Sequence, residues 1–270
     1  MQWEKDAEQA MSRVPFFVRK RVKKKVEAMA GDSGATMVTM VHVEACRQRF
    51  MTNQEKEVKG FQVETCFGAG GCPNAIANHG DMADRLEKTL AALNLKEFMR
   101  AKVDGPLKMH HEFRVSISDC PNSCSRPQIV DIGLIGAAMP TITAADCSRC
   151  EACITACREH GITLAAQGPA INFDMCLACG QCYQNCPTET LRPHKKGFRI
   201  LLGGKLGRHP QLGRELNTIF SPDETMTIVE KCLAHFMAHN EKGERFGELL
   251  NRTGYDFLKP LAILKKLGCP

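Results

Sequence analysis

The sequence is poor in aromatic residues and has no long apolar run. Phe, Tyr and Trp make up 6% of the 270 residues, with one Trp and two Tyr, so the core must rely on aliphatic side chains and Met. No stretch approaches the about 18 apolar residues of a membrane-spanning helix. Residues 1–11 are charged from Glu4 onward and lack the apolar segment of a signal peptide. We therefore expect a cytoplasmic protein without a membrane span.

Neither sign of charge dominates the chain. Lys and Arg number 36 against 30 Asp and Glu, a formal net charge of +6. No basic stretch is interleaved with aromatic residues, so nucleic-acid binding is not expected. The densest basic run, RKRVKKK at 19–25, is typical of a solvated helix face, with docking to an acidic partner as the alternative.

Fifteen cysteines are the unusual feature of the composition. Disulfide frameworks belong to short secreted chains with an even number of cysteines, which leaves zinc and iron–sulfur ligation as the main alternatives. We therefore expect a reducing compartment and cysteines that bind metal.

Eight cysteines form two runs of the pattern CxxCxxCxxxC, beginning at Cys147 and Cys176. Zinc ribbons use two CxxC pairs separated by a longer loop, so this spacing favours iron–sulfur clusters. The block resembles bacterial two-cluster ferredoxins, in which the fourth cysteine of each run ligates the other cluster. This resemblance predicts two [4Fe-4S] clusters. The ligands of one are Cys147, Cys150, Cys153 and Cys186, and the ligands of the other are Cys157, Cys176, Cys179 and Cys182. We call these sets the second and the third quartet, because another set of four cysteines precedes them in the chain.

Two further motifs, CFGAGGCPN at 66–74 and CPNSC at 120–124, contain four more cysteines. The glycines at 68, 70 and 71 would let backbone and a flat cofactor approach closely. The spacing Cx5C then Cx3C resembles the siroheme–[4Fe-4S] motif of the sulfite and nitrite reductase family. Residues 117–137 and 197–216 are also similar to that family.

The resemblance implies a third [4Fe-4S] cluster on the first quartet, Cys66, Cys72, Cys120 and Cys124. It also implies siroheme, with the sulfur of Cys124 bridging the cluster to the siroheme iron. Siroheme carries many carboxylates, so its pocket needs cations. Cys124, Lys205 and Arg208 are the predicted catalytic residues. The predicted siroheme contacts are Cys124, Arg114, Arg126, Lys205 and Arg208, with His209 as a further candidate.

The implied activity is six-electron reduction of sulfite to sulfide, with electrons from an external low-potential donor protein. Nitrite remains an alternative substrate. Full-length family members have a preceding half-module that supplies substrate-binding cations, whereas about 57 residues precede the motif region here. This leaves an electron-transfer subunit with a vestigial siroheme site, and a homodimer, as open alternatives. The candidate anion ligands of the distal face are Arg47, Arg49, Lys56 and Lys59.

Residues 1–30 resemble the C-terminal segment of a protochlorophyllide reductase subunit, which adds reduction of a tetrapyrrole as a third possibility. Periodicity predicts two helices there, with Phe17, Val18, Val22, Val26 and Met29 on the buried face of the second. Cys46, Cys232 and Cys269 are interpreted as packing or surface thiols.

The expected fold class is α+β. Strands are predicted at 112–118, 128–136 and 198–204, and helices at 82–93 and 221–239, the latter opened by a capping box at Ser221. The predicted parts are a helical segment 1–34, a sulfite-reductase-like siroheme domain formed by 35–140 and 195–270, and an inserted bacterial-type 2[4Fe-4S] ferredoxin domain, 141–194.

Overall fold

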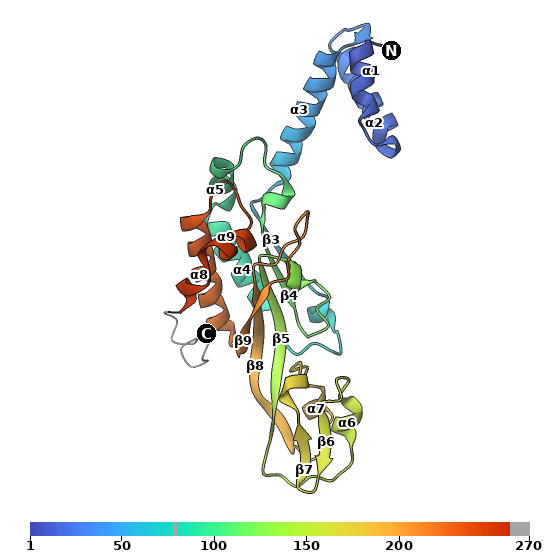
Figure 1. The fold of residues 1–270 in the computed structure, drawn as a ribbon. Helices are drawn as coiled ribbons and strands as arrows, with labels where there is room; N and C mark the ends of the chain where they lie inside the picture. The colour runs from blue at the N-terminus through green and yellow to red at the C-terminus, as the bar shows by residue number, and fades with distance from the viewer. Residues whose placement is uncertain (78–79, 260–270) are drawn as a thin grey trace. The chain divides into compact units, whose positions relative to one another are not determined.

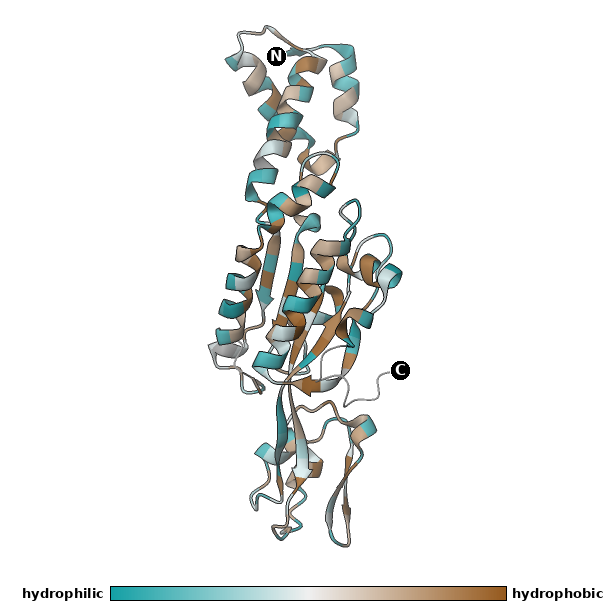
Figure 2. Ribbon diagram, turned by 90° about the vertical axis from the view of Figure 1, so that its left-hand side faces the viewer, coloured by the Kyte–Doolittle hydropathy of each residue, from teal (hydrophilic) through white to brown (hydrophobic). Residues whose placement is uncertain are grey.

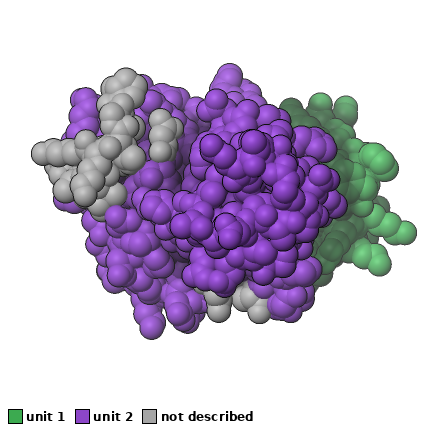
Figure 3. All heavy atoms as spheres, turned by 90° about the horizontal axis from the view of Figure 1, so that it is seen from below, with its two compact units in different colours: residues 1–59, 104–110 green, residues 60–103, 111–270 purple. Residues whose placement is uncertain are grey.

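A computed structural model describes residues 1–77 and 80–259. The chain forms two compact units (Figure 3). The first comprises residues 1–59 and 104–110, and the second comprises residues 60–103 and those from 111 onward. The cysteine-rich block is counted with the second unit, so its status as a separate inserted domain remains a prediction.

The first unit is helical. Helices α1 (Lys5–Ser12), α2 (Phe16–Asp32) and α3 (Met40–Glu57) pack around a small core that includes Val26 and Ala30. A short parallel pair, β1 (Gln2–Trp3) and β2 (Met37–Val38), accompanies them (Figure 1). The two helices predicted within residues 1–30 are confirmed, and α3 was not predicted.

The predicted buried face of α2 is wrong at its N-terminal end. Phe17 is 75% exposed and its neighbour Phe16 is 83% exposed, whereas Val26 is buried. Val18, Val22 and Met29 are partly buried. Helical spacing places these residues on related faces, but the small core of the unit covers α2 only around Val26 and Ala30.

The second unit is built on a five-stranded mixed sheet with the order β3-β4-β5-β8-β9. The first three strands are parallel, so their carboxyl ends lie at one edge of the sheet, and β8 and β9 continue it antiparallel. The three predicted strands match β4, β5 and β8, although residues 127–129 form a 3₁₀ turn and β8 begins earlier than predicted. The strands are β3 (Phe61–Thr65), β4 (Phe113–Ser118), β5 (Ile132–Ile142), β8 (Leu191–Leu202) and β9 (Arg214–Phe220).

Four helices cover one face of this sheet, as Figures 1 and 2 show: α4 (Gly80–Ala92), α5 (Leu95–Lys102), α8 (Pro222–His239) and α9 (Phe246–Thr253). The ring of Phe113 on β4 lies 5.0 Å from that of Phe236 on α8 and 5.5 Å from that of Phe246 on α9. Three of the aromatic residues thus pack together in this core. The capping box of α8 is confirmed, with Ser221 and Glu224 bonding each other's backbone N–H groups.

The opposite face of the sheet is polar along β4. Arg114, Ser116 and Ser118 alternate with the core residues Phe113, Val115 and Ile117, as the period of a strand requires. This face is where the loop that follows β4 folds back.

A long antiparallel ribbon formed by β5 and β8 connects the cysteine-rich block to the sheet (Figure 1). The pairing of the two strands extends to Ile142 and Leu191. The block itself, residues 143–190, contains a hairpin and two short helices. These are β6 (Ile162–Ala165), β7 (Gly168–Ile171), α6 (Ala152–Ala156) and α7 (Gln181–Gln184). No helix in the described part of the chain is long and apolar enough to cross a membrane.

Candidate metal centres

Two parallel strands place the first quartet at the carboxyl edge of the sheet. Cys66 directly follows β3, and Cys120 lies two residues beyond β4. The N–H of Cys66 donates to the carbonyl of Ile117 at 3.0 Å, which continues the pairing of the two strands. Two sequence segments about fifty residues apart therefore meet because their strands are neighbours.

The loop that contains Cys72 is fixed against the end of β4. The N–H groups of Ile76 and Ala77 donate to the carbonyl of Asp119 at 2.9 and 3.3 Å. A Cβ atom at Gly68 would lie 2.0 Å from Oδ2 of the buried Asp119, so only glycine fits there. Glycine here permits a close approach of the backbone to a buried side chain, whereas the expected approach to a flat cofactor stays a prediction.

A network of buried serines holds the second loop of the site. The hydroxyl of Ser116 donates to the carbonyl of Ser125, and that of Ser125 donates to the carbonyl of Ile117, both at 2.7 Å. The hydroxyls of Ser118 and Ser125 are 2.6 Å apart. The network folds the loop back over the polar face of the sheet, while Cys124 stays exposed.

The four thiols of the first quartet share one electrostatic environment. Burial raises the pKa of Cys120, the N–H of Asn122 opposes the rise, and nearby Cys72, Cys124 and Cys66 raise it further. The N–H groups of Gly68 and Asp119 donate to Sγ of Cys66 at 3.3 and 3.2 Å. N–H donors of this kind stabilise a thiolate over a thiol.

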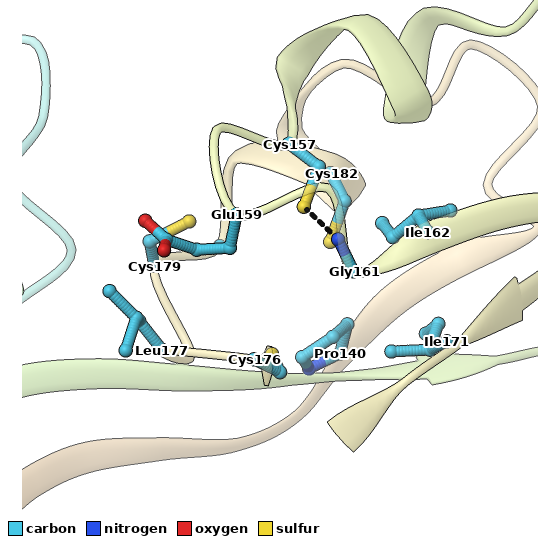
Figure 4. Close-up of a pocket in the computed structure, with 11 residues that line it drawn as sticks. Pro140, Cys157, Glu159, Gly161, Ile162, Ile171, Cys176, Leu177, Cys179 and Cys182 are labelled. Atoms are coloured by element: carbon cyan, nitrogen blue, oxygen red, sulfur yellow. Dashed lines mark hydrogen bonds between the residues drawn. The ribbon is translucent and has the colours of Figure 1, made fainter. Parts of the chain in front are cut away.

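The third quartet lines a small open pocket of about 20 Å³ in the cysteine-rich block (Figure 4). The remaining wall is mainly apolar, including Pro140, Ile162 and Ile171. Burial raises the pKa of Cys182 to about 12 and also raises the pKa of Cys176. Cys182 and Cys176 are therefore protonated at neutral pH, and binding of a metal cluster would release their protons.

The second quartet also comes together. Cys150 and Cys153 both interact electrostatically with Cys186, and Cys153 with Cys147. Cys150 is exposed, and its pKa is lowered chiefly by the backbone N–H of Ala152. Cys153 is buried in α6, and burial raises its pKa.

The chemistry of the predicted donor sets fits iron–sulfur clusters. All twelve predicted ligands are cysteines, as such clusters require, and the members of each predicted quartet are neighbours. Backbone N–H groups donate to cysteine sulfurs in the other two quartets as well. The donor in the second quartet is Arg149, and the donors in the third are Gly161 and Ala178, all at 3.3–3.4 Å. Among residues 1–77 and 80–259, no three His, Cys, Asp or Glu side chains converge to hold a single metal ion. A cubane instead takes one thiolate at each of four separated corners.

Two predicted cofactor-binding arginines lie on β4 and on the loop that follows it. Arg114 is on the polar face of β4 and pairs with Glu64. Its Nε atom is buried and has no hydrogen-bond partner in the described part of the chain, so it suits an anionic group. Arg126 is exposed two residues after Cys124, with φ of 57°.

The remaining predicted cations lie on the loop between β8 and β9. Gly204 approaches the backbone of Gln128 so closely that a Cβ would lie 2.3 Å from its carbonyl oxygen, which places this loop beside residues 127–129. Lys205 is only 8% exposed, and its Nζ lies 2.6 Å from Oε1 of Glu248 on α9. Arg208 and His209 are exposed. Catalytic roles for Lys205 and Arg208 stay predictions.

The candidate distal ligands belong to the first unit. Arg47, Arg49 and Lys56 are exposed on α3, and Lys59 is the last residue before the second unit. Cys46 packs against the core of that unit, Cys232 is buried on α8, and Cys269 lies outside the described residues.

The sequence-based prediction missed Tyr183 and Arg199, which lie between the sheet and the block. Arg199 pairs with Glu215 and also donates to the carbonyl of Leu177 at 3.4 Å. Tyr183 packs beside Cys120. Its position directly after Cys182, in a chain with two tyrosines, was the available signal.

Residues 59–269 match the family described as "Nitrite and sulphite reductase 4Fe-4S domain". The chain belongs to this family. Residues 3–47 match the family described as "Proto-chlorophyllide reductase 57 kD subunit". Both resemblances noted in the sequence are therefore confirmed.

The curated relatives are named as sulfite reductases. The chain is 30% identical over 204 residues to a coenzyme F420-dependent sulfite reductase of Methanocaldococcus jannaschii, covering 74% of this chain and 30% of the relative. It is 29% identical over 160 residues to the beta subunit of a dissimilatory-type sulfite reductase of Archaeoglobus fulgidus, covering 53% and 43%. The chain thus spans less than half the length of these relatives.

A solved structure has a similar fold. The crystal structure of dissimilatory sulfite reductase I aligns with a TM-score of 0.50 at 19% identity, covering 73% of this chain and 51% of that one. The likeness supports a mixed helix and strand fold of the sulfite reductase type.

Proposed function

We propose that the protein catalyses siroheme-dependent six-electron reduction of sulfite to sulfide. The observation that carries the proposal is the meeting of Cys66, Cys72, Cys120 and Cys124 at one sheet edge, next to a second cysteine-rich region. Family membership and the names of the relatives support the same activity.

The first quartet would hold a [4Fe-4S] cluster, and the exposed Cys124 would also help to hold the siroheme. The other two quartets would hold the ferredoxin-type clusters. When bound, these groups supply the electrons and the iron at which the anion is reduced.

The chain's own cations would bind and orient the anionic groups. The orphaned Nε of Arg114 and the exposed guanidinium groups of Arg126 and Arg208 can pair with carboxylates of the tetrapyrrole. Lys205, on the same loop as Arg208, is held in place by Glu248 of α9, and its ammonium group could donate a proton to a departing oxygen. An external low-potential protein would supply the electrons.

The test combines cofactor content and turnover. Purified protein, expressed with siroheme synthesis intact, is expected to show Soret and long-wavelength chlorin bands and to reduce sulfite with reduced methyl viologen. Iron–sulfur absorption without chlorin bands would instead indicate an electron-transfer subunit.

Nitrite and a panel of tetrapyrroles are assayed in parallel, because the proposed iron–sulfur and siroheme centres would supply electrons to any of the three substrates. Turnover of nitrite but not sulfite would replace the proposed substrate. Turnover of a tetrapyrrole alone would favour the activity suggested by residues 3–47.

A further inference from the structure

One tyrosine contacts the surroundings of both the first quartet and the cysteine-rich block. Tyr183 follows Cys182 in α7, and its side chain packs against a buried cluster of Cys120, Ile76 and Ala138. It also packs against a second buried cluster, which contains Cys182 of the third quartet and Cys153 of the second. Its half-buried ring therefore fills the space between two groups of predicted ligands.

A backbone hydrogen bond runs alongside this contact. The N–H of Ala138 donates to the carbonyl of Ala178 at 2.7 Å, and Ala138 forms a β-bridge with Cys179. Ala138 is fully buried and packs in the same cluster as Cys120. A member of the third quartet is thus joined to a member of the first through one residue of β5.

Arg199 on β8 fixes the same segment of the block from a second strand. It donates to the carbonyl of Leu177 at 3.4 Å and is held by Glu215 at 2.5 and 2.7 Å. Cys176 also interacts electrostatically with Arg199. The segment attached to the sheet is therefore the one that carries most of the third quartet, whereas Cys150 of the second quartet is exposed to solvent.

From these contacts, and resting on the proposed function, we infer the order of the electron relay. The second quartet receives electrons from the donor protein, and the third quartet passes them to the first through Ala138 and Tyr183. In the last step one electron leaves the centre on the third quartet, which is oxidised by one electron. It reaches the centre on the first quartet, which is reduced by one, and no bond forms or breaks. Tyr183 acts as a positioning residue through the volume of its ring.

The order is tested by magnetic coupling in the dithionite-reduced holoprotein. Cys179→Ala removes a ligand of the third quartet, and Cys150→Ala is the matched change in the second. Electron paramagnetic resonance is expected to show loss of the spin–spin interaction on the first-quartet centre in Cys179→Ala and its retention in Cys150→Ala. The reverse pattern would overturn the order.

The role of Tyr183 is tested with variants that keep all twelve ligands. In Tyr183→Leu we expect full iron content, a weaker spin–spin interaction and about tenfold slower arrival of electrons at the first-quartet centre, as a small loss of positioning implies. Tyr183→Phe should restore both properties, and Tyr255→Leu, at the other half-buried tyrosine, should change neither.

Unchanged coupling and unchanged electron arrival in an iron-replete Tyr183→Leu protein would refute the inference. Because both readouts are measured on reduced protein without sulfite, they are independent of the proposed activity. A protein that shows the predicted coupling but no sulfite turnover would contradict the proposed function alone.

Discussion

The first quartet and the two quartets of the cysteine-rich block are assembled in different ways. In the block, CxxCxxCxxxC runs bring three of four ligands together within one tight loop, and only the fourth comes from the other run. The first quartet needs two loops that meet because β3 and β4 are parallel neighbours. The block therefore depends mainly on local spacing, whereas the first quartet depends on the sheet and on the contacts that hold its loops.

This difference has a functional consequence under the proposed activity. A locally built site tolerates changes elsewhere in the chain, so the ferredoxin-type centres should survive substitutions that disturb the sheet edge. The site at the sheet edge should be lost through residues that bind no metal, such as Gly68 and Ser125, because they position the ligands.

The largest difference between the effects on the first quartet and on the cysteine-rich block is expected for Cys124→Ser. Loss of this thiol should abolish sulfite reduction and the chlorin bands, because Cys124 would help to hold both the cluster and the siroheme. The absorption of the ferredoxin-type centres should remain. Visible spectra and methyl-viologen turnover measure this, with Cys46→Ser as a control outside all three quartets. Wild-type turnover in Cys124→Ser would rule out its predicted role.

Gly68→Ala should also affect the first quartet more than the cysteine-rich block. Its Cβ would lie 2.0 Å from Oδ2 of Asp119, which is 1% exposed and has no room to move, so the loop should shift at a cost of about 3 kcal/mol. Iron should be lost from the first quartet while the ferredoxin-type iron is retained. Iron analysis and denaturant unfolding measure the two effects.

Gly31→Ala is the control for this change. Gly31 lies in α2, and its added Cβ would meet only Met1 at 3.8 Å, so this helical site should be neutral or slightly stabilised. Equal iron loss in both variants would show that the approach of Gly68 to Asp119 is not what holds the site.

Ser125→Ala should have a smaller effect in the same direction. It removes the hydroxyl that donates to Ile117 and contacts Ser118, so we expect the free energy of unfolding to fall by about 1–3 kcal/mol. The exposed Ser33→Ala change should stay within about 0.5 kcal/mol. If the two variants unfold alike, the serine network does not support the loop.

The smallest effect is expected from the pair formed by Lys205 and Glu248. The hydrogen bond from Lys205 lowers the pKa of Glu248 below its ordinary value of 4.5. A lowered carboxyl pKa stabilises the fold above the ordinary value, and this contribution is lost as the pH falls through the lowered pKa. The Glu248 side chain is 44% exposed, so the contribution should be about 1 kcal/mol or less.

Lys205→Met measures this pair. Its deficit in the free energy of unfolding should be present at about pH 7 and shrink as the pH falls through the lowered pKa of Glu248. A deficit that does not change with pH would mean that the packing of Lys205, rather than its charge, is what Glu248 and α9 require.

Much of this protein could be predicted from local patterns. The strand at 112–118 alternates strictly, and the helix from Pro222 has a complete capping box, so both were found. The membership of all three quartets followed from spacing and family resemblance. Burial was predicted wrongly for the first turn of α2, at Phe17. Helical periodicity shows which residues share a face, but it does not show how far the partner helices extend along that face.

By itself the sequence determined which segments form strands and predicted which side chains ligate, since residue alternation and cysteine spacing act over a few residues. Only the tertiary structure decided what lies between the centres. The contacts of Tyr183 with Cys120, of Ala138 with Ala178 and of Arg199 with Leu177 join residues from different elements. Such contacts arise from the register of β5 and β8, which no local pattern encodes.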